Sequence, residues 1–491
     1  MLVLVKKIRW ALPALIVVAL TMGIQPAAGQ DGGCFSVVVG KDVSTDGWVL
    51  MAHNEDDENP QIVNYRKIHG QSHASGETVN LDHGGVIPQA SQTWDYLWSE
   101  MPGMLFSDSY LNEWGVCVCS DACPSREDSA EFTDGGIDYK LRRIVAERAR
   151  TAREGVHIAG ALIEQFGYAS SGRTYIISDP NEGWLLCAVY GKHWAARRVP
   201  DDQVALIANT YTVHEIDLTD TMNYLAAPDV IDYAEEHGWY NPRSNRAFDF
   251  AAVYADPNAA ENPHNIGRLW DGVRQIAADP PAYGEPLPFS VKPKSKIGPG
   301  DLMRLLRSHY EGTALHAADS AIECPHDFST STICNRETQT SFVAQLRGGL
   351  PPEIGLVWWA CLSSPCLSCY VPFHFGIDSF PDFYEGPAVP PTQEDYQILI
   401  DRPFGVDETS AFWTFTCWRH YGEQRYADIA AGVRHVFDET EIVALARQSA
   451  VETEAADLMA IDRQKGLKTL ADYSRSVYTA AVAHLRQLRI R

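Results

Sequence analysis

The sequence has little positive charge. Its 491 residues include 40 Lys and Arg against 64 Asp and Glu, which leaves a formal net charge of −24. A surface of that sign repels phosphate groups, so we expect no nucleic-acid partner and no attraction to an anionic membrane surface. Hydrophobic residues make up 45% of the chain. That share excludes a disordered protein and is enough for one large domain with an appendage, or for two domains.

Several catalytic and repetitive motifs are also missing. The sequence contains no Gly-rich phosphate loop, no His-Glu-x-x-His pair and no Gly-x-Ser-x-Gly elbow, and no segment of 20–50 residues repeats. These absences argue against a P-loop nucleotide hydrolase, a zinc protease of the His-Glu-x-x-His type, a serine hydrolase with a nucleophile elbow and a solenoid. The sequence therefore predicts neither a cofactor nor a metal.

Long apolar runs are scarce outside the first 30 residues. There, Lys6, Lys7 and Arg9 precede the apolar run 10–24, and the small residues of 26–29 follow it. A run of roughly 15 residues is short for a membrane span and typical of a secretory signal peptide. We therefore expect a signal peptide over 1–28, a secreted or periplasmic protein, and no stable membrane insertion after the signal is removed.

The cysteines are odd in number. Eleven are present, so at least one stays unpaired if the others form disulfides in an oxidising compartment. With Cys34 as the free thiol, ten are left, which is enough for five bridges. Two groups are close in sequence, and neither has paired C-x-x-C spacing with His at ligand intervals, so disulfides or buried thiols are favoured over a zinc site. These groups are Cys117, Cys119 and Cys123, and Cys361, Cys366 and Cys369.

One short stretch organises the chain. A flexible run, Asp31-Gly32-Gly33, ends at Cys34, where an apolar β-branched run begins. After a turn a second apolar run, 48–52, leads into the polar cluster 53–59. Because a hairpin returns its second strand to the edge where the first began, Cys34 is expected beside Asn54 and Asp56.

Further landmarks follow in order along the chain. We expect two helices between Tyr139 and Phe166, a strand that ends at Asn209, and two closing helices after Tyr421. The segment 219–299 is expected to decorate the rim. The landmarks are Cys34, Asn54-Glu55-Asp56, the turn Asn112-Glu113-Trp114-Gly115, Asn209, and Glu337-Thr338-Gln339-Thr340-Ser341-Phe342-Val343.

Taken together, this ordered set resembles the dipeptidase A family of cysteine N-terminal-nucleophile hydrolases, which is related to secernins, penicillin V acylases and bile-salt hydrolases. The resemblance implies an α+β fold, a four-layer αββα sandwich of antiparallel sheets with a C-terminal helical extension. It implies a signal peptide over 1–28, a propeptide over 29–33, a catalytic domain over 34–430 and a helical pair over 431–491. Short peptides, most of all dipeptides, are the implied substrates; a homo-oligomer is left open.

The resemblance also assigns roles to residues. Cys34 is the nucleophile, and its α-amine, freed when the Gly33–Cys34 bond is cut, is the general base. Asp56 holds that amine or the substrate's ammonium group, and Asn209 donates to the oxyanion. Asn54 braces the loop, and both it and His53 are predicted substrate-binding residues. His53 stands where many relatives carry Arg, so it either acidifies the thiol or only bonds a loop carboxylate.

Two alternatives stay open. The first is an acylase of the same superfamily that acts on N-acyl amides or β-lactams, for which an apolar acyl pocket is needed. The second is a non-catalytic envelope protein in which Cys34 is lipidated or disulfide-bonded. An Arg completes the pocket in acylase relatives, and Arg336 is the nearest candidate for it here.

Overall fold

The computed structural model describes residues 33–57, 61–102, 107–244, 246–386 and 404–488. All of them belong to one compact unit, which spans Asp31–Arg491. The predicted signal peptide, 1–28, and all of the predicted propeptide except Gly33 lie outside the described residues. No helix among the described residues is both long enough and apolar enough to span a membrane.

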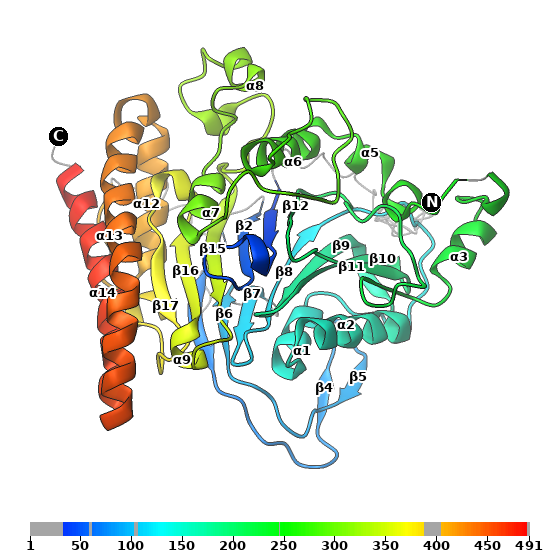
Figure 1. Ribbon diagram of the computed structural model, residues 1–491, viewed down its shortest axis with the longest axis horizontal. Helices are drawn as coiled ribbons and strands as arrows, with labels where there is room; N and C mark the ends of the chain where they lie inside the picture. The colour runs from blue at the N-terminus through cyan, green and yellow to red at the C-terminus, as the bar shows by residue number, and fades with distance from the viewer. Residues whose placement is uncertain (1–32, 58–60, 103–106, 245, 387–403, 489–491) are drawn as a thin grey trace, which may run out of the picture. The chain divides into compact units, whose positions relative to one another are not determined.

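Two antiparallel sheets form the middle of this unit (Figure 1). The first sheet contains Cys34's hairpin at its centre, and its strands lie in the order β14 (Ser290–Val291), β12 (Val204–Ile207), β1 (Phe35–Val39), β2 (Leu50–Asp56), β15 (Thr338–Leu346), β16 (Leu356–Leu362) and β17 (Val371–His374). The second sheet has the order β13 (Tyr224–Ala226), β11 (Trp194–Arg198), β10 (Gly183–Gly191), β9 (Tyr168–Ser178), β8 (Cys117–Ala122), β7 (Ser107–Asn112), β6 (Tyr96–Glu100) and β3 (Asn64–Ile68). A separate small ribbon pairs β4 (Thr78–Asn80) with β5 (Val86–Pro88).

Helices cover the outer face of each sheet. On the second sheet, α1 (Lys140–Arg148) contacts β7 and β8, and α2 (Ala152–Phe166) contacts β9, β10 and β11. On the first sheet, α6 (Pro263–Ile276) contacts β12 and α7 (Pro299–Leu305) contacts β15. The two sheets touch each other where β1 and β2 meet β8 and β9. This stacking confirms the predicted four-layer αββα arrangement.

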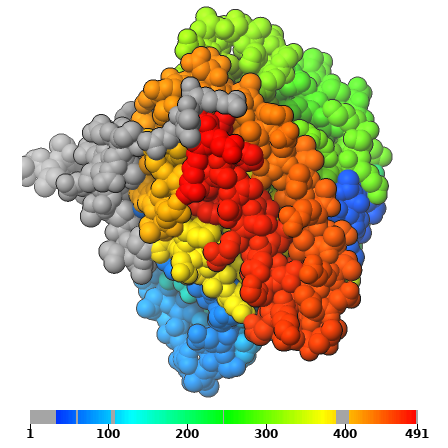
Figure 2. Space-filling model, turned by 90° about the vertical axis from the view of Figure 1, so that its left-hand side faces the viewer, coloured from blue at the N-terminus to red at the C-terminus, as the bar shows by residue number. Residues whose placement is uncertain are grey.

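The chain closes with three helices on the first sheet. These are α12 (Ala411–Glu423), α13 (Tyr426–Ile461) and α14 (Arg463–Leu488). The pair α13 and α14 is antiparallel and packs on the sheet through contacts of α14 with β17, while α12 contacts β16. Figure 2 shows α14, in red, lying alongside α13 on this face of the molecule. Residue 431, the predicted start of the helical pair, lies within α13.

Shorter helices connect the layers. They are α3 (Val230–Glu236), α4 (Phe250–Tyr254), α5 (Pro257–Ala260), α8 (Ala314–Ala318), α9 (Pro352–Gly355) and α10 (Asp382–Glu385), with 3-10 turns η1 (Lys41–Val43), η2 (Pro242–Ser244), η3 (Pro325–Asp327) and η4 (Pro365–Leu367). The expectation that 219–299 only decorates the rim is wrong for α6. Its Arg268 and Asp271 are fully buried, because this helix lies against β12 and presents polar side chains to the protein interior.

Local sequence explains the central hairpin. β1, Phe-Ser-Val-Val-Val, is apolar except for Ser36, and all of it is buried, as expected for a strand with a layer on each face. β2 begins apolar and ends in His53-Asn54-Glu55-Asp56, still buried and still paired with β15. Phe35 pairs with Asn54 across the hairpin. The polar end of β2 is therefore held beside the start of β1.

Candidate functional site

Cys34 lies at the start of β1, and its side chain is only 5% exposed. Its Sγ donates a hydrogen bond to Oε2 of Glu55 at 3.2 Å and lies 3.7 Å from the backbone oxygen of Asp56. Burial and the negative charge of Glu55 raise the pKa of the thiol well above its ordinary value. The sulfur is therefore a neutral thiol that is hydrogen-bonded to the side chain of Glu55.

Asp56, the last residue of β2, contacts the loop before β15. Its Oδ2 accepts a hydrogen bond from the amide of Asn335, whereas Oδ1 is buried and has no hydrogen-bond partner among the described residues. Burial raises the pKa of Asp56 to about 7, although Arg268 and Asn335 act in the opposite direction. A buried carboxylate oxygen without a donor is costly, so this atom is ready to accept from an amine.

Arg268 is the cation of the site, and the sequence prediction missed it. From α6, its Nη1 donates to the backbone oxygens of Gly33 and Cys34, the latter at 2.8 Å. Its Nη2 donates to Oδ1 of Asn209 at 3.0 Å and to Oδ1 of Asn265 at 2.8 Å. The guanidinium thus touches the carbonyl of the bond predicted to be cut. The sequence signal that could have found Arg268 is a pair of polar residues one helical turn apart, Asn265 and Arg268. The structure buries both of them.

Arg336, the predicted pocket arginine, does not contact the nucleophile but lines a cavity that adjoins the site. Its side chain is 50% exposed, and it pairs with Asp327 at 2.7 Å and, more loosely, with Glu423 at 3.8 Å. Among the described residues, its side chain has no hydrogen bond or ion pair with Cys34, Asp56 or Asn209. Sequence proximity to the β15 landmark suggested Arg336, but the fold brings an arginine from a helix about 70 positions earlier to the nucleophile.

Asn209 lies just after β12 and has a left-handed backbone, with φ of 48°. Its Nδ2 donates to the carbonyl of Ala122 at 2.9 Å, and its Oδ1 accepts from Arg268. The structure therefore brings Asn209 to the predicted place beside the Gly33–Cys34 bond. The side chain that donates to the Gly33 oxygen, however, is that of Arg268.

His53 and Glu55 lie on the other face of β2 from Asn54, because side chains alternate along a strand. Nε2 of His53 lies 3.1 Å from Glu55 and 3.2 Å from Oδ1 of Asp108, and Nδ1 lies 2.8 Å from Ser36 and 3.5 Å from Asp121. Burial alone lowers the pKa of His53, but the negative groups around it, including Asp108, raise it well above the ordinary value. His53 is thus a buried cation next to the carboxylate that contacts the thiol.

Glu55 connects the nucleophile to this charged group. Burial and the charge of Asp108 raise the pKa of Glu55, and His53 lowers it in part. Its Oε2 receives both the Cys34 hydrogen bond and the His53 contact. The sequence prediction placed Glu55 in the landmark but gave it no role.

Asn54, a predicted substrate-binding residue, is fully buried. Its Nδ2 donates to the backbone oxygens of Leu306 at 2.9 Å and Ile333 at 2.8 Å. These bonds brace two loops against β2. Because both amide hydrogens are used within the chain, the structure gives no support to a substrate contact from this nitrogen.

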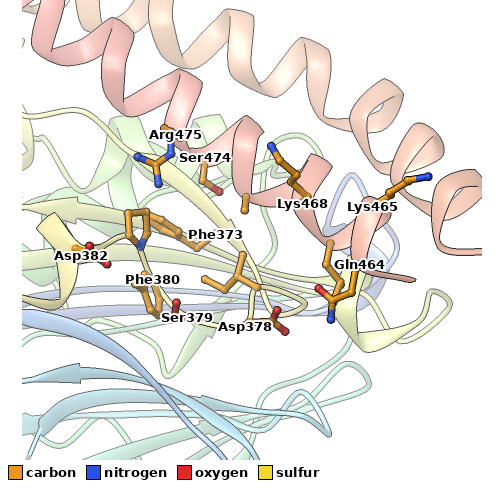
Figure 3. Close-up of a pocket in the computed structure, with 14 residues that line it drawn as sticks. Phe373, Asp378, Ser379, Phe380, Asp382, Gln464, Lys465, Lys468, Ser474 and Arg475 are labelled. Carbon is orange, nitrogen blue, oxygen red and sulfur yellow. The ribbon is translucent and has the colours of Figure 1, made fainter. Parts of the chain in front are cut away.

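Two cavities are relevant to the location of the site. One, of about 470 Å³, is lined by Asn335, Arg336, Glu337 and His264 among others. Asn335 also contacts Asp56, so this cavity adjoins the Cys34 site. The other, of about 500 Å³, lies between α14 and the segment after β17 and includes Asp378, Lys468 and Arg475 (Figure 3). It contains none of the predicted site residues.

Comparisons with known proteins cover most of the chain. The family model described as peptidase family C69 matches residues 128–439, which excludes the β1–β2 hairpin. A probable dipeptidase A from Streptococcus pyogenes serotype M3 (strain SSI-1) is 24% identical over 466 residues, covering 90% of this chain and 94% of its own. A dipeptidase from Bifidobacterium longum (strain NCC 2705) is 28% identical over 418 residues, covering 74% of this chain and 75% of its own.

Among solved structures, the penicillin V acylase from Agrobacterium tumefaciens matches with a TM-score of 0.36 and 11% sequence identity. The match covers 70% of this chain and 87% of the acylase. The αββα assignment above rests instead on the strand order and layer contacts of this chain.

Proposed function

The chain belongs to peptidase family C69, and we propose that it is an exported cysteine dipeptidase that uses Cys34 as its nucleophile after cutting its own Gly33–Cys34 bond. Family membership makes the chain a peptidase. The dipeptide substrate, the self-cleavage and the export are the content of the proposal. Relatives named as dipeptidases that cover up to 90% of the chain support the substrate class.

One observation carries the proposal: the attacking thiol and the carbonyl oxygen of the scissile bond are both hydrogen-bonded to buried side chains. The Cys34 thiol donates to Glu55, and Arg268 donates to the carbonyl oxygen of Gly33. A carboxylate that takes the thiol proton and a cation that stabilises charge on the carbonyl oxygen are the two groups that thiol attack on an amide requires. Both side chains are buried, where such electrostatic stabilisation is strongest.

The proposed self-cleavage uses both contacts. Cys34 Sγ attacks the Gly33 carbonyl carbon as Glu55 takes the thiol proton, and negative charge forms on the oxygen held by Arg268. The bond from Gly33 to the Cys34 nitrogen then breaks, and that nitrogen takes up a proton. Water hydrolyses the resulting thioester, which leaves a Gly33 carboxylate, a free thiol and a free α-amine. Glycine suits this position because a Cβ on Gly33 would lie 2.2 Å from Oδ1 of Asn209.

After cleavage the α-amine becomes the base for catalysis. Its reference pKa, about 8, is close to physiological pH, and covalent geometry keeps it near the sulfur. The unpartnered Oδ1 of Asp56 is the acceptor that would hold this amine, or the ammonium group of the substrate. Arg268, which donates to the Gly33 oxygen and to Oδ1 of Asn209, would stabilise the oxyanion of the substrate, with Asn209 beside it.

The polarity of the site favours a dipeptide over an N-acyl amide. The sulfur contacts Glu55 and the backbone oxygen of Asp56, and Arg268 binds the backbone oxygen of Cys34, whereas an acyl chain needs apolar walls. The adjoining cavity contains Arg336, which we assign to the carboxylate of the substrate. Lipidation is disfavoured because it would replace the hydrogen bond of a buried thiol to Glu55 with a lipid chain.

Turnover of two substrates by matched variants tests the proposal. The wild-type protein is expected to hydrolyse Ala-Ala, and Cys34→Ser to lose this activity, while Cys187→Ser, a buried cysteine on β10, keeps it. Hydrolysis of penicillin V without hydrolysis of dipeptides would instead establish the acylase. A mature protein that turns over neither substrate, with a Cys34 that no thiol reagent modifies, would favour the envelope protein. Export is tested by the location of the full-length chain after cell fractionation.

A further inference from the structure

Four side chains with metal-binding atoms converge outside the Cys34 site. Their ligand atoms all lie within 4.8 Å of one another. They come from four segments: the loop after α7, η3, the loop before β15, and η4. We call them the Cys–His cluster: His309, His326, Cys334 and Cys366.

Two distances within the Cys–His cluster match those between ligand atoms of a tetrahedral zinc ion. Nε2 of His326 lies 3.3 Å from Sγ of Cys366 and 3.8 Å from Sγ of Cys334. Tetrahedral zinc, with bonds of about 2.3 Å to sulfur and 2.0–2.1 Å to nitrogen, places such atoms ~3.6 Å apart. The two observed distances bracket that value.

Each histidine of the Cys–His cluster is oriented by a carboxylate. Nδ1 of His326 lies 2.7 Å from Glu423, and Nδ1 of His309 lies 3.1 Å from Glu311. In zinc sites a carboxylate commonly binds the ring nitrogen that faces away from the metal, which fixes the tautomer and the ring. Both Nε2 atoms are thereby left to face the two sulfurs.

One atom of the Cys–His cluster lacks a partner. Nε2 of His309 is buried and has no hydrogen bond among the described residues, and the His309 side chain is only 4% exposed. A buried ring nitrogen normally has a hydrogen bond or binds a metal. A Cys334–Cys366 disulfide would satisfy the sulfurs but would leave this nitrogen without a partner.

We propose that the Cys–His cluster is a structural zinc site. Two thiolates and two neutral imidazoles are a ligand set that zinc prefers over hard cations such as Mg²⁺ or Ca²⁺. All four positions are supplied by protein side chains, so no position is left for water or substrate, as in structural rather than catalytic sites. Binding releases the protons of Cys334 and Cys366 to solvent. His326 lines the cavity of about 470 Å³, which provides a path for the ion.

The zinc site would support the peptidase site through the chain itself. Asn335, next to Cys334, donates to Asp56, and the backbone oxygen of Ile333, on its other side, accepts from Asn54. An ion on Cys334 therefore fixes both contacts with the polar end of β2. The four proposed zinc ligands are all outside the Cys34 site, so the test of the zinc site does not depend on the proposed peptidase chemistry.

Metal content of the full purified protein tests the proposal. Inductively coupled plasma mass spectrometry on protein prepared without chelator is expected to find about one zinc per chain. Cys366→Ser and His326→Gln are expected to lose it. Cys369→Ser, a buried cysteine three positions from Cys366 but outside the cluster, is expected to keep it. Cys34→Ser is also expected to keep it, which separates this site from the nucleophile.

A spectroscopic measurement covers the case in which the ligand variants fail to fold. X-ray absorption at the zinc edge of the wild-type protein is expected to show two sulfur and two nitrogen neighbours. Replacement by Co²⁺ should give a thiolate-to-cobalt charge-transfer band. A peptide map with a Cys334–Cys366 disulfide, a zinc-free wild-type protein, a zinc shell without sulfur, or loss of zinc in Cys34→Ser alone would each overturn the proposal.

Discussion

Arg268→Lys is the substitution that most directly tests how the chain cuts itself. In the wild-type protein the two terminal nitrogens of the guanidinium reach four acceptor oxygens. A lysine ammonium has three donors at a single point, so it keeps the charge but cannot reach acceptors spread over the width of a guanidinium. We therefore expect the Gly33 oxygen to lose its well-placed donor.

The size of the effect follows from the role of that donor. Loss of one donor to a developing oxyanion typically slows a reaction by about 10²–10³-fold, or roughly 3–4 kcal/mol in the barrier. The Gly33 oxygen carries that charge during self-cleavage, and Arg268 is the side chain on it. We expect Arg268→Lys to slow cleavage of the Gly33–Cys34 bond by this factor.

Cell-free synthesis of the chain without residues 1–28, sampled and quenched over time, gives the cleavage rate by intact mass. Arg274→Lys is the control, because Arg274 lies on the same helix but pairs with Asp271 at 2.6 Å, away from Cys34. Circular dichroism establishes that both variants are folded. Cleavage of Arg268→Lys within threefold of the wild-type rate would refute the role given to the guanidinium.

Three further predictions concern the same site. The pKa of Asp56, about 7, exceeds the unfolded value, so the stability gained from its bound proton is present at low pH and lost as pH rises through 7. In uncut Cys34→Ala protein, Asp56→Asn should therefore raise the free energy of unfolding at pH 8 by up to about 4 kcal/mol and have little effect on it at pH 4. Chemical denaturation at the two pH values measures both effects. Gly33→Ala should slow self-cleavage, measured by intact mass, because its Cβ would displace Asn209; an unchanged rate would count against the close contact. His53→Gln removes the cation that lowers the pKa of Glu55, so the acid limb of the pH profile for cleavage should move to higher pH; an unmoved limb would leave His53 only a structural role.

Much of the fold could be predicted because its signals are local. The apolar run of β1, the turn, and the polar end of β2 identified the hairpin, and helical spacing identified α1 and α2. Asn112 was recognisable for the same reason: its Oδ1 accepts from the backbone of the turn that it begins. Such patterns depend on neighbours in sequence.

The parts that the sequence did not predict depend on distant segments. Arg268 lies 234 positions after Cys34, and only the packing of α6 on β12 brings it to the Gly33 oxygen. The Cys–His cluster draws one ligand from each of four segments, so no paired spacing marks it, and the zinc interpretation was disfavoured. All eleven cysteines lie in described residues as free thiols, ten of them buried.

The N-terminal sequence and intact mass of the mature protein test the central claim most directly. The account predicts that active wild-type protein begins at Cys34, and that Cys34→Ala, expressed in the same way, keeps Gly33 and has no peptidase activity. A fully active wild-type chain that still carries Gly33 would contradict it.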